Sequence, residues 1–279
     1  PEVTFAIEFA RGCYWRKCSF CAVDISHKKY CMKPMENLID EIEYLVKCHG
    51  IRNFVFVDEA IPVKKYVEFA DRVLERKLDI RFYSFARMEK GYSYEVLKHL
   101  KEAGLSILWW GYESKSGRIM ELMNKGIDVE ERISILENGY RAGIWNHCLC
   151  MAGFPTESRE EILSTFEEIR VNRRLFNSCA MNAFFLSYNS PMYQEPERYG
   201  ITSISIPNAF ESHCHFKMRE HTEKEYQDMV NSFRAQYAHE NKSKLWAMEY
   251  NNFDHLLMYI KKYGCEKVRD YDAEQNRCF

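Results

Sequence analysis

The sequence lacks an excess of charge of either sign, a long hydrophobic run and any low-complexity tract. Its 39 lysines and arginines nearly balance 41 aspartates and glutamates, for a net charge of -2 over 279 residues. Binding to the nucleic-acid backbone usually needs a basic excess, so a polyelectrolyte function is disfavoured. No stretch approaches about twenty consecutive apolar residues, and no basic leader precedes an apolar segment, so we expect neither a membrane span nor a signal peptide.

Cysteine, by contrast, is plentiful. Eleven cysteines are unevenly spaced in a chain that is long enough to bury a large core without cross-links. This pattern favours reduced thiols and metal ligands over a disulfide framework, and hence a reducing compartment. We therefore expect a cytoplasmic protein.

Strand-like and helix-like segments alternate along most of the chain. Strands are expected at residues 3–9, 53–57, 80–85, 106–112, 145–151 and 180–186. Helices are expected at 34–48, 63–74, 93–103, 116–142 with a break at Gly126, and 157–175. Six β-α units in a row predict an α/β fold with a parallel sheet, namely a partial (β/α)6 barrel with its chemistry at the carboxyl ends of the strands.

The chain after the sixth strand changes character. We assign residues 1–190 to the barrel core and residues 191–279 to a C-terminal extension, irregular at first and then helical at about 222–240 and 253–263. These helices would form a small cap. Capping boxes, in which a side chain and a backbone N–H bond reciprocally, are predicted for three pairs: Asp128 with Glu131, Ser158 with Glu161, and Thr222 with Glu225.

A C-x4-C-x2-C run, Cys13, Cys18 and Cys21, directly follows the first expected strand. Thiolates this close can wrap a soft metal or an iron-sulfur cluster. Cys31 could complete a zinc site, although zinc usually takes paired C-x2-C knuckles. Cys48 could complete a plant-type 2Fe-2S site, which the spacing alone favours. A ferredoxin needs no six-fold β-α scaffold, however, whereas three thiolates at a barrel mouth would leave one iron open.

This arrangement resembles the radical S-adenosylmethionine (SAM) superfamily, in which three cysteines, usually spaced C-x3-C-x2-C, follow strand one. Phe20 stands before the last cysteine, as the family's aromatic residue does. The resemblance implies that Cys13, Cys18 and Cys21 hold a 4Fe-4S cluster, that Phe20 lies at the cofactor site, and that SAM binds the fourth iron. The extra residue between Cys13 and Cys18 departs from the family's pattern.

Further motifs resemble the family at later strand ends. Asp58, followed by Glu59, corresponds to an acidic position that contacts the SAM amino group, and Arg87 to a guanidinium that could pair with the SAM carboxylate. The G-x-E-S motif around Glu113 and the N-K-G after it resemble the cobalamin-binding branch and the tRNA methylthiotransferases. By that resemblance Glu113 would hydrogen-bond the SAM ribose.

Two other matches are less specific. A G-F-P-x-E turn starts at Gly153, and Ser190-Pro191 follows the sixth expected strand; a strand that simply ends before a capped helix would explain the first equally well. The resemblance rests mainly on the order in which these motifs follow one another along residues 3–200.

The resemblance implies reductive cleavage of SAM to methionine and a 5'-deoxyadenosyl radical, with a flavodoxin- or ferredoxin-type protein as external one-electron donor. We favour a peptide or natural-product substrate over nucleic acid. Methyl transfer would need cobalamin, through a domain upstream of Pro1. The alternatives are an iron-sulfur electron carrier without SAM chemistry and a radical SAM enzyme that modifies RNA.

Some residues have no assigned task. His213-Cys214-His215 and Cys148-x-Cys150 have a spacing that could bind a second metal, but buried thiols and ordinary histidines are the more usual explanation. No catalytic residue can be chosen among the remaining cysteines.

Overall fold

The computed structural model describes residues 2–23, 29–206, 208, 213–218, 222–241 and 253–275. Six parallel strands form one sheet in the order β1-β4-β5-β6-β7-β8. The strands are β1 (Thr4–Ile7), β4 (Asn53–Phe56), β5 (Arg81–Arg87), β6 (Leu105–Glu113), β7 (Trp145–Ala152) and β8 (Ser178–Ala183). Since β1 and β8 do not pair, the sheet is a partial barrel, and the predicted fold class is confirmed.

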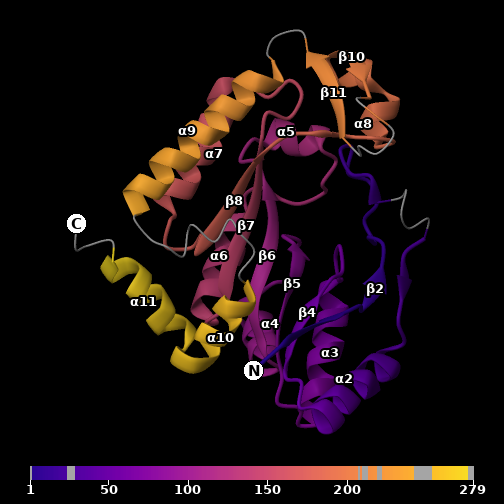
Figure 1. Cartoon of the computed structure of the whole chain (residues 1–279), viewed down its shortest axis with the longest axis vertical. Coiled ribbons are helices and arrows are strands. Elements are labelled where there is room, and N and C mark those ends of the chain that lie inside the picture. The colour runs from indigo at the N-terminus through magenta and orange to yellow at the C-terminus, as the bar shows by residue number, and fades with distance from the viewer. Residues whose placement is uncertain are drawn as a thin grey trace.

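Helices follow the strands and cover the convex face of the sheet (Figure 1). They are α2 (Met35–His49), α3 (Val63–Glu75), α4 (Tyr94–Glu102), α6 (Arg132–Arg141) and α7 (Arg159–Val171), whereas α5 (Gly117–Leu122) lies beyond the strand ends and buries Ile119 and Met120 in a separate cluster. Alternation along a strand places every second side chain on this face. In β6, Leu108, Trp110 and Tyr112 therefore join the main core, whereas Trp109 faces the concave side.

The concave face is partly filled by α10 (Phe253–Tyr263). Its buried side chains Phe253 and Leu257 pack against Tyr83, Ile107 and Trp145, which lie toward the amino ends of their strands. This helix therefore closes one half of the concave face and leaves the half at the carboxyl ends of the strands for the motifs. Among the described helices, none is both long enough and apolar enough to cross a membrane.

The C-terminal extension contains strands where the sequence predicted irregular chain. There, β10 (Ile201–Ser205) and β11 (His213–Met218) form a three-stranded antiparallel sheet above the barrel together with β9 (Leu186–Ser187), which lies in the predicted core at the end of the sixth expected strand (Figure 1). Cys214 and Phe216 are buried there against Leu186 and Met192, contacts between distant segments that local sequence patterns do not reveal. Helix α9 (Glu223–Asn241) confirms the expected helix, α11 (Cys265–Gln275) was not predicted, and the boundary at residue 190 stays a prediction.

Two of the three predicted capping boxes form. Ser158 and Glu161 bond reciprocally at the start of α7, and Thr222 and Glu225 do so at the start of α9. The box at Asp128 was wrong: its carboxylate accepts the N–H of Glu130 in a turn, and α6 begins only at Arg132. The helix expected over 116–142 with a break at Gly126 is two helices, α5 and α6, and the loop that separates them contains Gly126.

Candidate functional site

The cysteine loop lies at the carboxyl end of β1, between the short strands β2 (Ala10–Arg11) and β3 (Cys31–Met32). Cys13, Cys18 and Cys21 border one cavity of about 230 Å³. Burial raises the pKa of the Cys18 thiol, and it raises the pKa of Cys21 to about 11. These thiols therefore need a nearby positive centre to ionise, and three soft sulfur donors around one cavity fit an iron-sulfur cluster.

Other cysteines do not join this cavity. Cys31 and Cys48 are exposed and do not border it, so the geometry favours neither the zinc nor the 2Fe-2S alternative. Within the described part of the chain, no three His, Cys, Asp or Glu side chains converge as a site for a single ion, so His213-Cys214-His215 forms no second metal site. Cys150 is buried, with its Sγ 3.5 Å from Sγ of Cys179.

Asp58 is buried at the end of β4, and its carboxylate accepts hydrogen bonds from the backbone N–H groups of Phe9, at 3.0 Å, and Ala10. Burial raises its pKa to about 6 against these hydrogen bonds. The carboxylate thus ties the end of β4 to the chain that enters the cysteine loop. The neighbouring Glu59 is exposed and close enough to influence the Cys21 thiol, so it is the freer carboxylate of the two.

Glu113 ends β6 in a left-handed backbone conformation, with φ of 63°. Its Oε1 accepts a hydrogen bond from Nζ of Lys125 at 2.5 Å, and both side chains are nearly buried. Burial lowers the pKa of Lys125, but Glu113 and Cys18 raise it more, so the ammonium is retained. A Cβ on Gly111 would press on this Lys125 Nζ, which explains the glycine of the G-x-E-S motif.

Lys125 was missed as a site residue. It is the lysine of the N-K-G motif, so its position in that motif was the available signal. Its Nζ also lies 5.9 Å from the ring centre of Phe20, which is partly buried among apolar neighbours. The structure therefore brings Glu113, Phe20 and Cys18 together around one buried cation.

Arg87 is buried at the end of β5. Its guanidinium donates to the carbonyl oxygen of Lys125 at 2.5 Å and lies 4.5 Å from the ring centre of Trp15. Nε makes no hydrogen bond and lies 3.9 Å from a carboxylate oxygen of Glu89. The side chain therefore supports the loop that carries Lys125, a task beyond the expected pairing with a SAM carboxylate.

The G-x-E-S and G-F-P-x-E motifs are joined by a hydrogen bond. Ser114 Oγ donates to Glu157 Oε1 at 2.9 Å, and Glu157 Oε2 accepts the N–H groups of Gly153 at 2.7 Å and Phe154 at 3.2 Å. Burial raises the pKa of Glu157 to about 7, opposed by these hydrogen bonds. The turn after β7 is thus fastened to the end of β6.

Replacing Glu157 with glutamine should remove a pH dependence of folding. Because the folded pKa is about 7, above the ordinary 4.5, the native state binds this proton more tightly than the unfolded chain does. The resulting stability is present below pH 4.5 and is lost as the pH rises through about 7, by about 3 kcal/mol in all. Glu157→Gln should lack this loss in urea unfolding at pH 5 and pH 8.

Asp58 titrates in the same direction, but it is present in both proteins and cancels in the difference. The exposed Glu130→Gln variant is the control and should follow the wild type. Parallel pH profiles for wild type and Glu157→Gln would contradict the prediction.

A partial α/β barrel with three cysteine thiols around one cavity and a buried carboxylate-ammonium pair at its strand ends is the arrangement expected of an iron-sulfur enzyme that binds SAM. The family model described as Radical SAM superfamily matches residues 7–169. The chain belongs to the radical SAM superfamily, whose members hold a 4Fe-4S cluster and SAM, and it is an enzyme of that family.

Curated relatives match over part of their length. An uncharacterized methyltransferase of Pyrococcus horikoshii is 29% identical over 161 residues, which are 57% of this chain and 35% of the relative. The anaerobic magnesium-protoporphyrin IX monomethyl ester cyclase of Rubrivivax gelatinosus is 28% identical over 170 residues, 58% of this chain and 30% of the relative. A ribosomal protein uS12 methylthiotransferase of Pelodictyon phaeoclathratiforme is 27% identical, covering 62% of this chain and 42% of the relative.

Among solved structures, the cobalamin-dependent SAM radical enzyme OxsB superposes with a TM-score of 0.66 at 14% identity. The match covers 96% of this chain and 46% of OxsB, and it concerns the fold. The predicted membership of the radical SAM superfamily is confirmed, and the fold is similar to that of a cobalamin-dependent member. The methylthiotransferase among these relatives is one of ribosomal protein uS12, whereas the sequence motifs had indicated the tRNA methylthiotransferases. The chain spans about a third of the length of the first two relatives, so the activity of a whole protein is a matter for proposal.

Proposed function

We propose that this chain cleaves SAM reductively at a 4Fe-4S cluster held by Cys13, Cys18 and Cys21. The observation that carries the proposal is that these three thiols border one cavity at the strand ends, with the Glu113–Lys125 pair close to Cys18. When bound, the cluster and SAM supply a 5'-deoxyadenosyl radical after receiving one electron from an external donor of flavodoxin or ferredoxin type. The protein's own residues bind and orient the cluster and SAM, and they exclude water from the site.

Each site residue has a part in this proposal. Glu113 would accept hydrogen bonds from the SAM ribose while Lys125 holds its carboxylate in place. Asp58 would set the entry to the cysteine loop through the N–H groups of Phe9 and Ala10, and the exposed Glu59 would receive the SAM amino group. Arg87 would act chiefly through the Lys125 backbone.

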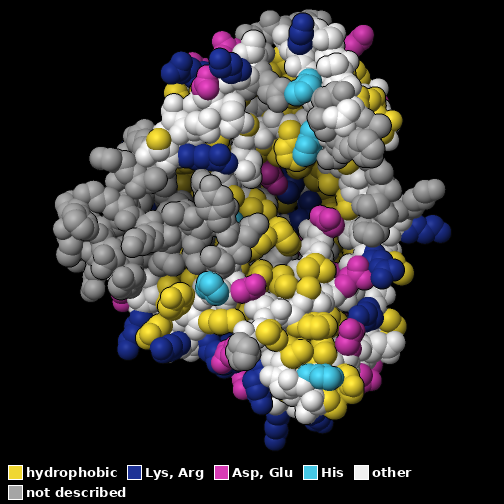
Figure 2. All heavy atoms as spheres, in the orientation of Figure 1, with side chains coloured by type: hydrophobic (Ala, Val, Ile, Leu, Met, Phe, Trp, Pro, Cys, Tyr) yellow, Lys and Arg dark blue, Asp and Glu magenta, His cyan; other side chains and the backbone are white. Residues whose placement is uncertain are grey.

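The substrate should be largely apolar. The strand register places Phe85 and Leu149 on the concave side, outside the cluster that packs against α10, and Val57, next along from the concave-side Val55, is 52% exposed. Figure 2 shows a hollow in the middle of this face of the molecule, bordered by hydrophobic side chains, with charged groups inside. An apolar wall beside a reactive site favours a peptide side chain or a natural product over a polyanion such as RNA.

Methyl transfer would need cobalamin from a region outside this sequence. The overlap with less than half of a cobalamin-dependent enzyme and the similarity to a methyltransferase support this extension of the proposal.

Unpaired thiols and iron-sulfur chemistry also suit a reducing compartment, which supports the cytoplasm as the place of action.

Anaerobic reconstitution with iron and sulfide tests the core of the proposal. Reduction with dithionite should give a 4Fe-4S EPR signal that SAM perturbs, and 5'-deoxyadenosine should form in a parallel assay. A 2Fe-2S spectrum that SAM does not change, with no 5'-deoxyadenosine formed, would contradict the proposal. The C-x4-C spacing of Cys13 and Cys18 would then indicate an electron carrier and not a SAM-cleaving enzyme.

Val57→Asp tests the apolar substrate wall. Since Val57 is exposed, the change should leave folding and substrate-free SAM cleavage unchanged. A carboxylate on the wall should instead weaken binding of the uncharged apolar probe Nile red by about tenfold, measured by fluorescence. Val171→Asp, at a 67% exposed position on α7, is the matched control, and equal probe binding by both variants would contradict the assignment of the wall.

A further inference from the structure

The lengthened cysteine loop carries a tryptophan that reaches across to another motif. Trp15 lies between Cys13 and Cys18, and its indole N–H donates to the carbonyl oxygen of Asn124 at 2.7 Å. The Arg87 guanidinium lies over the indole ring, and the same guanidinium donates to the carbonyl oxygen of Lys125. One aromatic ring and one cation thus hold two successive residues of the N-K-G motif.

Gly126 provides the space for this ring. It has a left-handed backbone, with φ of 66°, and a Cβ built on it would overlap the six-membered ring of Trp15. The glycine of N-K-G is therefore required twice, once by its conformation and once by the close approach of the tryptophan.

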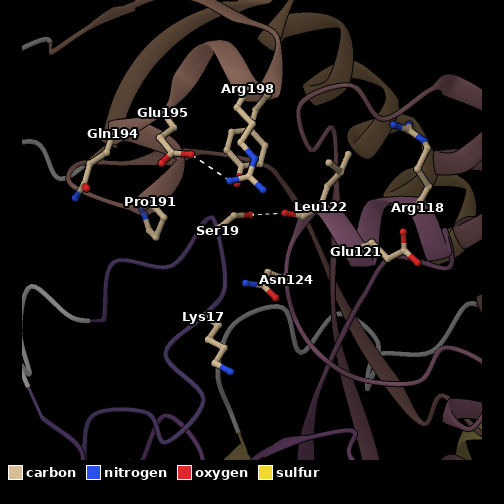
Figure 3. A pocket seen from close by; sticks show the side chains of 11 residues that line it. Lys17, Ser19, Arg118, Glu121, Leu122, Asn124, Pro191, Gln194, Glu195 and Arg198 are labelled. Atoms are coloured by element: carbon tan, nitrogen blue, oxygen red, sulfur yellow. Dashed lines mark hydrogen bonds and ion pairs between the residues drawn. The ribbon is translucent and has the colours of Figure 1, made fainter.

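A second contact lies further along the same loop. Ser19 N–H donates to the carbonyl oxygen of Met123 at 2.9 Å, and Ser19 Oγ donates to that of Leu122 at 2.9 Å. Figure 3 shows Ser19 and Leu122 joined in this way, with Asn124 next to them, at the wall of a cavity of about 660 Å³. The cysteine loop is therefore fastened on both sides of Cys18 to the segment 122–126, which we name the docking segment.

We propose that Trp15 is a positioning residue that docks the lengthened cysteine loop onto the docking segment and thereby fixes Lys125 against Glu113 and Cys18. The extra residue between Cys13 and Cys18 then has a structural role, because it lengthens the loop so that the Trp15 indole can contact Gly126. This inference rests on the proposed function, since it concerns how the loop presents its thiols to a cluster and SAM.

The test compares Trp15→Ala, Gly126→Ala and the double variant, reconstituted with iron and sulfide. Trp15→Ala should retain iron but raise the dissociation constant for SAM, measured by EPR titration, by about ten- to hundredfold. Gly126→Ala should do the same, because its methyl group displaces the ring. The double variant should lose clearly less affinity than the product of the two single losses, since the contact with the ring can be lost only once and only the left-handed backbone of Gly126 adds a separate cost.

Two controls separate this contact from ordinary destabilisation. Gly50→Ala also places alanine at a left-handed position, φ of 68°, but meets no neighbouring atom, so it should leave the SAM affinity at the wild-type value. Trp15→Phe keeps an aromatic ring under Arg87 but lacks the N–H that donates to Asn124, so it should recover only part of the affinity lost in Trp15→Ala.

The outcomes distinguish the two hypotheses. If the wild-type protein shows no EPR change with SAM, the proposed function fails. If the wild type responds and Trp15→Ala binds SAM equally well, or if the two losses multiply in the double variant, the positioning role of Trp15 is overturned.

Discussion

Cys18→Ala should reduce 5'-deoxyadenosine formation below detection. Cys18 lies between the other two thiols in the sequence and borders the same cavity, so its loss leaves two sulfur donors for a cluster that needs three. Removal of a ligand from a metal site typically costs the metal as well as the activity. Iron should fall from about four per chain to well under two after reconstitution and desalting.

Cys48→Ala is the matched control for this experiment. Cys48 is exposed on α2, outside the cavity, so iron content and nucleoside formation should stay at wild-type values. Loss of iron in Cys48→Ala together with retention in Cys18→Ala would reverse the ligand assignment and restore the ferredoxin-like spacing as the better interpretation.

Lys125→Met should produce the largest loss of folding stability among the changes considered. The substitution leaves the Glu113 carboxylate nearly buried without its 2.5 Å partner. Removal of one member of a buried ion pair typically costs about 3–5 kcal/mol, because the remaining charge is neither solvated nor paired. Chemical unfolding should therefore show a decrease of that size, and the SAM affinity should fall with it.

The partner experiment changes both residues. Glu113→Gln combined with Lys125→Met removes both charges and should recover about half or more of the lost stability, since a neutral amide costs less to bury without a partner than a carboxylate charge does. SAM affinity should not recover, because the ribose would still lack its carboxylate. Lys90→Met, at an exposed pair with Glu131, should cost less than about 1 kcal/mol and serves as control. A similarly small loss in Lys125→Met would contradict the account of the pair.

The parallel sheet was predictable because its signal is local and repeated. Each strand is a short run of β-forming residues, and an amphipathic helical pattern follows each of the first five, so the alternation specifies the sheet without any long-range information. The hairpin of β10 and β11 has no such signal. Cys214 and Phe216 become strand residues because they are buried against Leu186 and Met192. A window of six residues carries no information about burial by segments that are distant in the sequence.

The sequence predicted which positions form the site, but it did not predict which of their side chains contact one another. The motif order placed Cys13, Cys18, Cys21 and Glu113 at the strand ends, but it could not show that Glu113 is paired with Lys125. Nor could it show that the Asp58 carboxylate is directed at backbone N–H groups, because that depends on how β1 and β4 lie side by side. Pairings across 12 and 49 residues arise from the fold itself.

The bond between Ser114 and Glu157 also constrains how this sequence can diverge. A lineage that loses the serine hydroxyl keeps a buried carboxyl with one unmet acceptor, while a lineage that loses the carboxyl first leaves two backbone N–H groups unmet as well. Loss of the serine hydroxyl first therefore costs less folding stability than loss of the carboxyl first. Across descendants of this chain, the two positions should be inherited as a unit, with glutamate persisting longer than serine where the unit breaks.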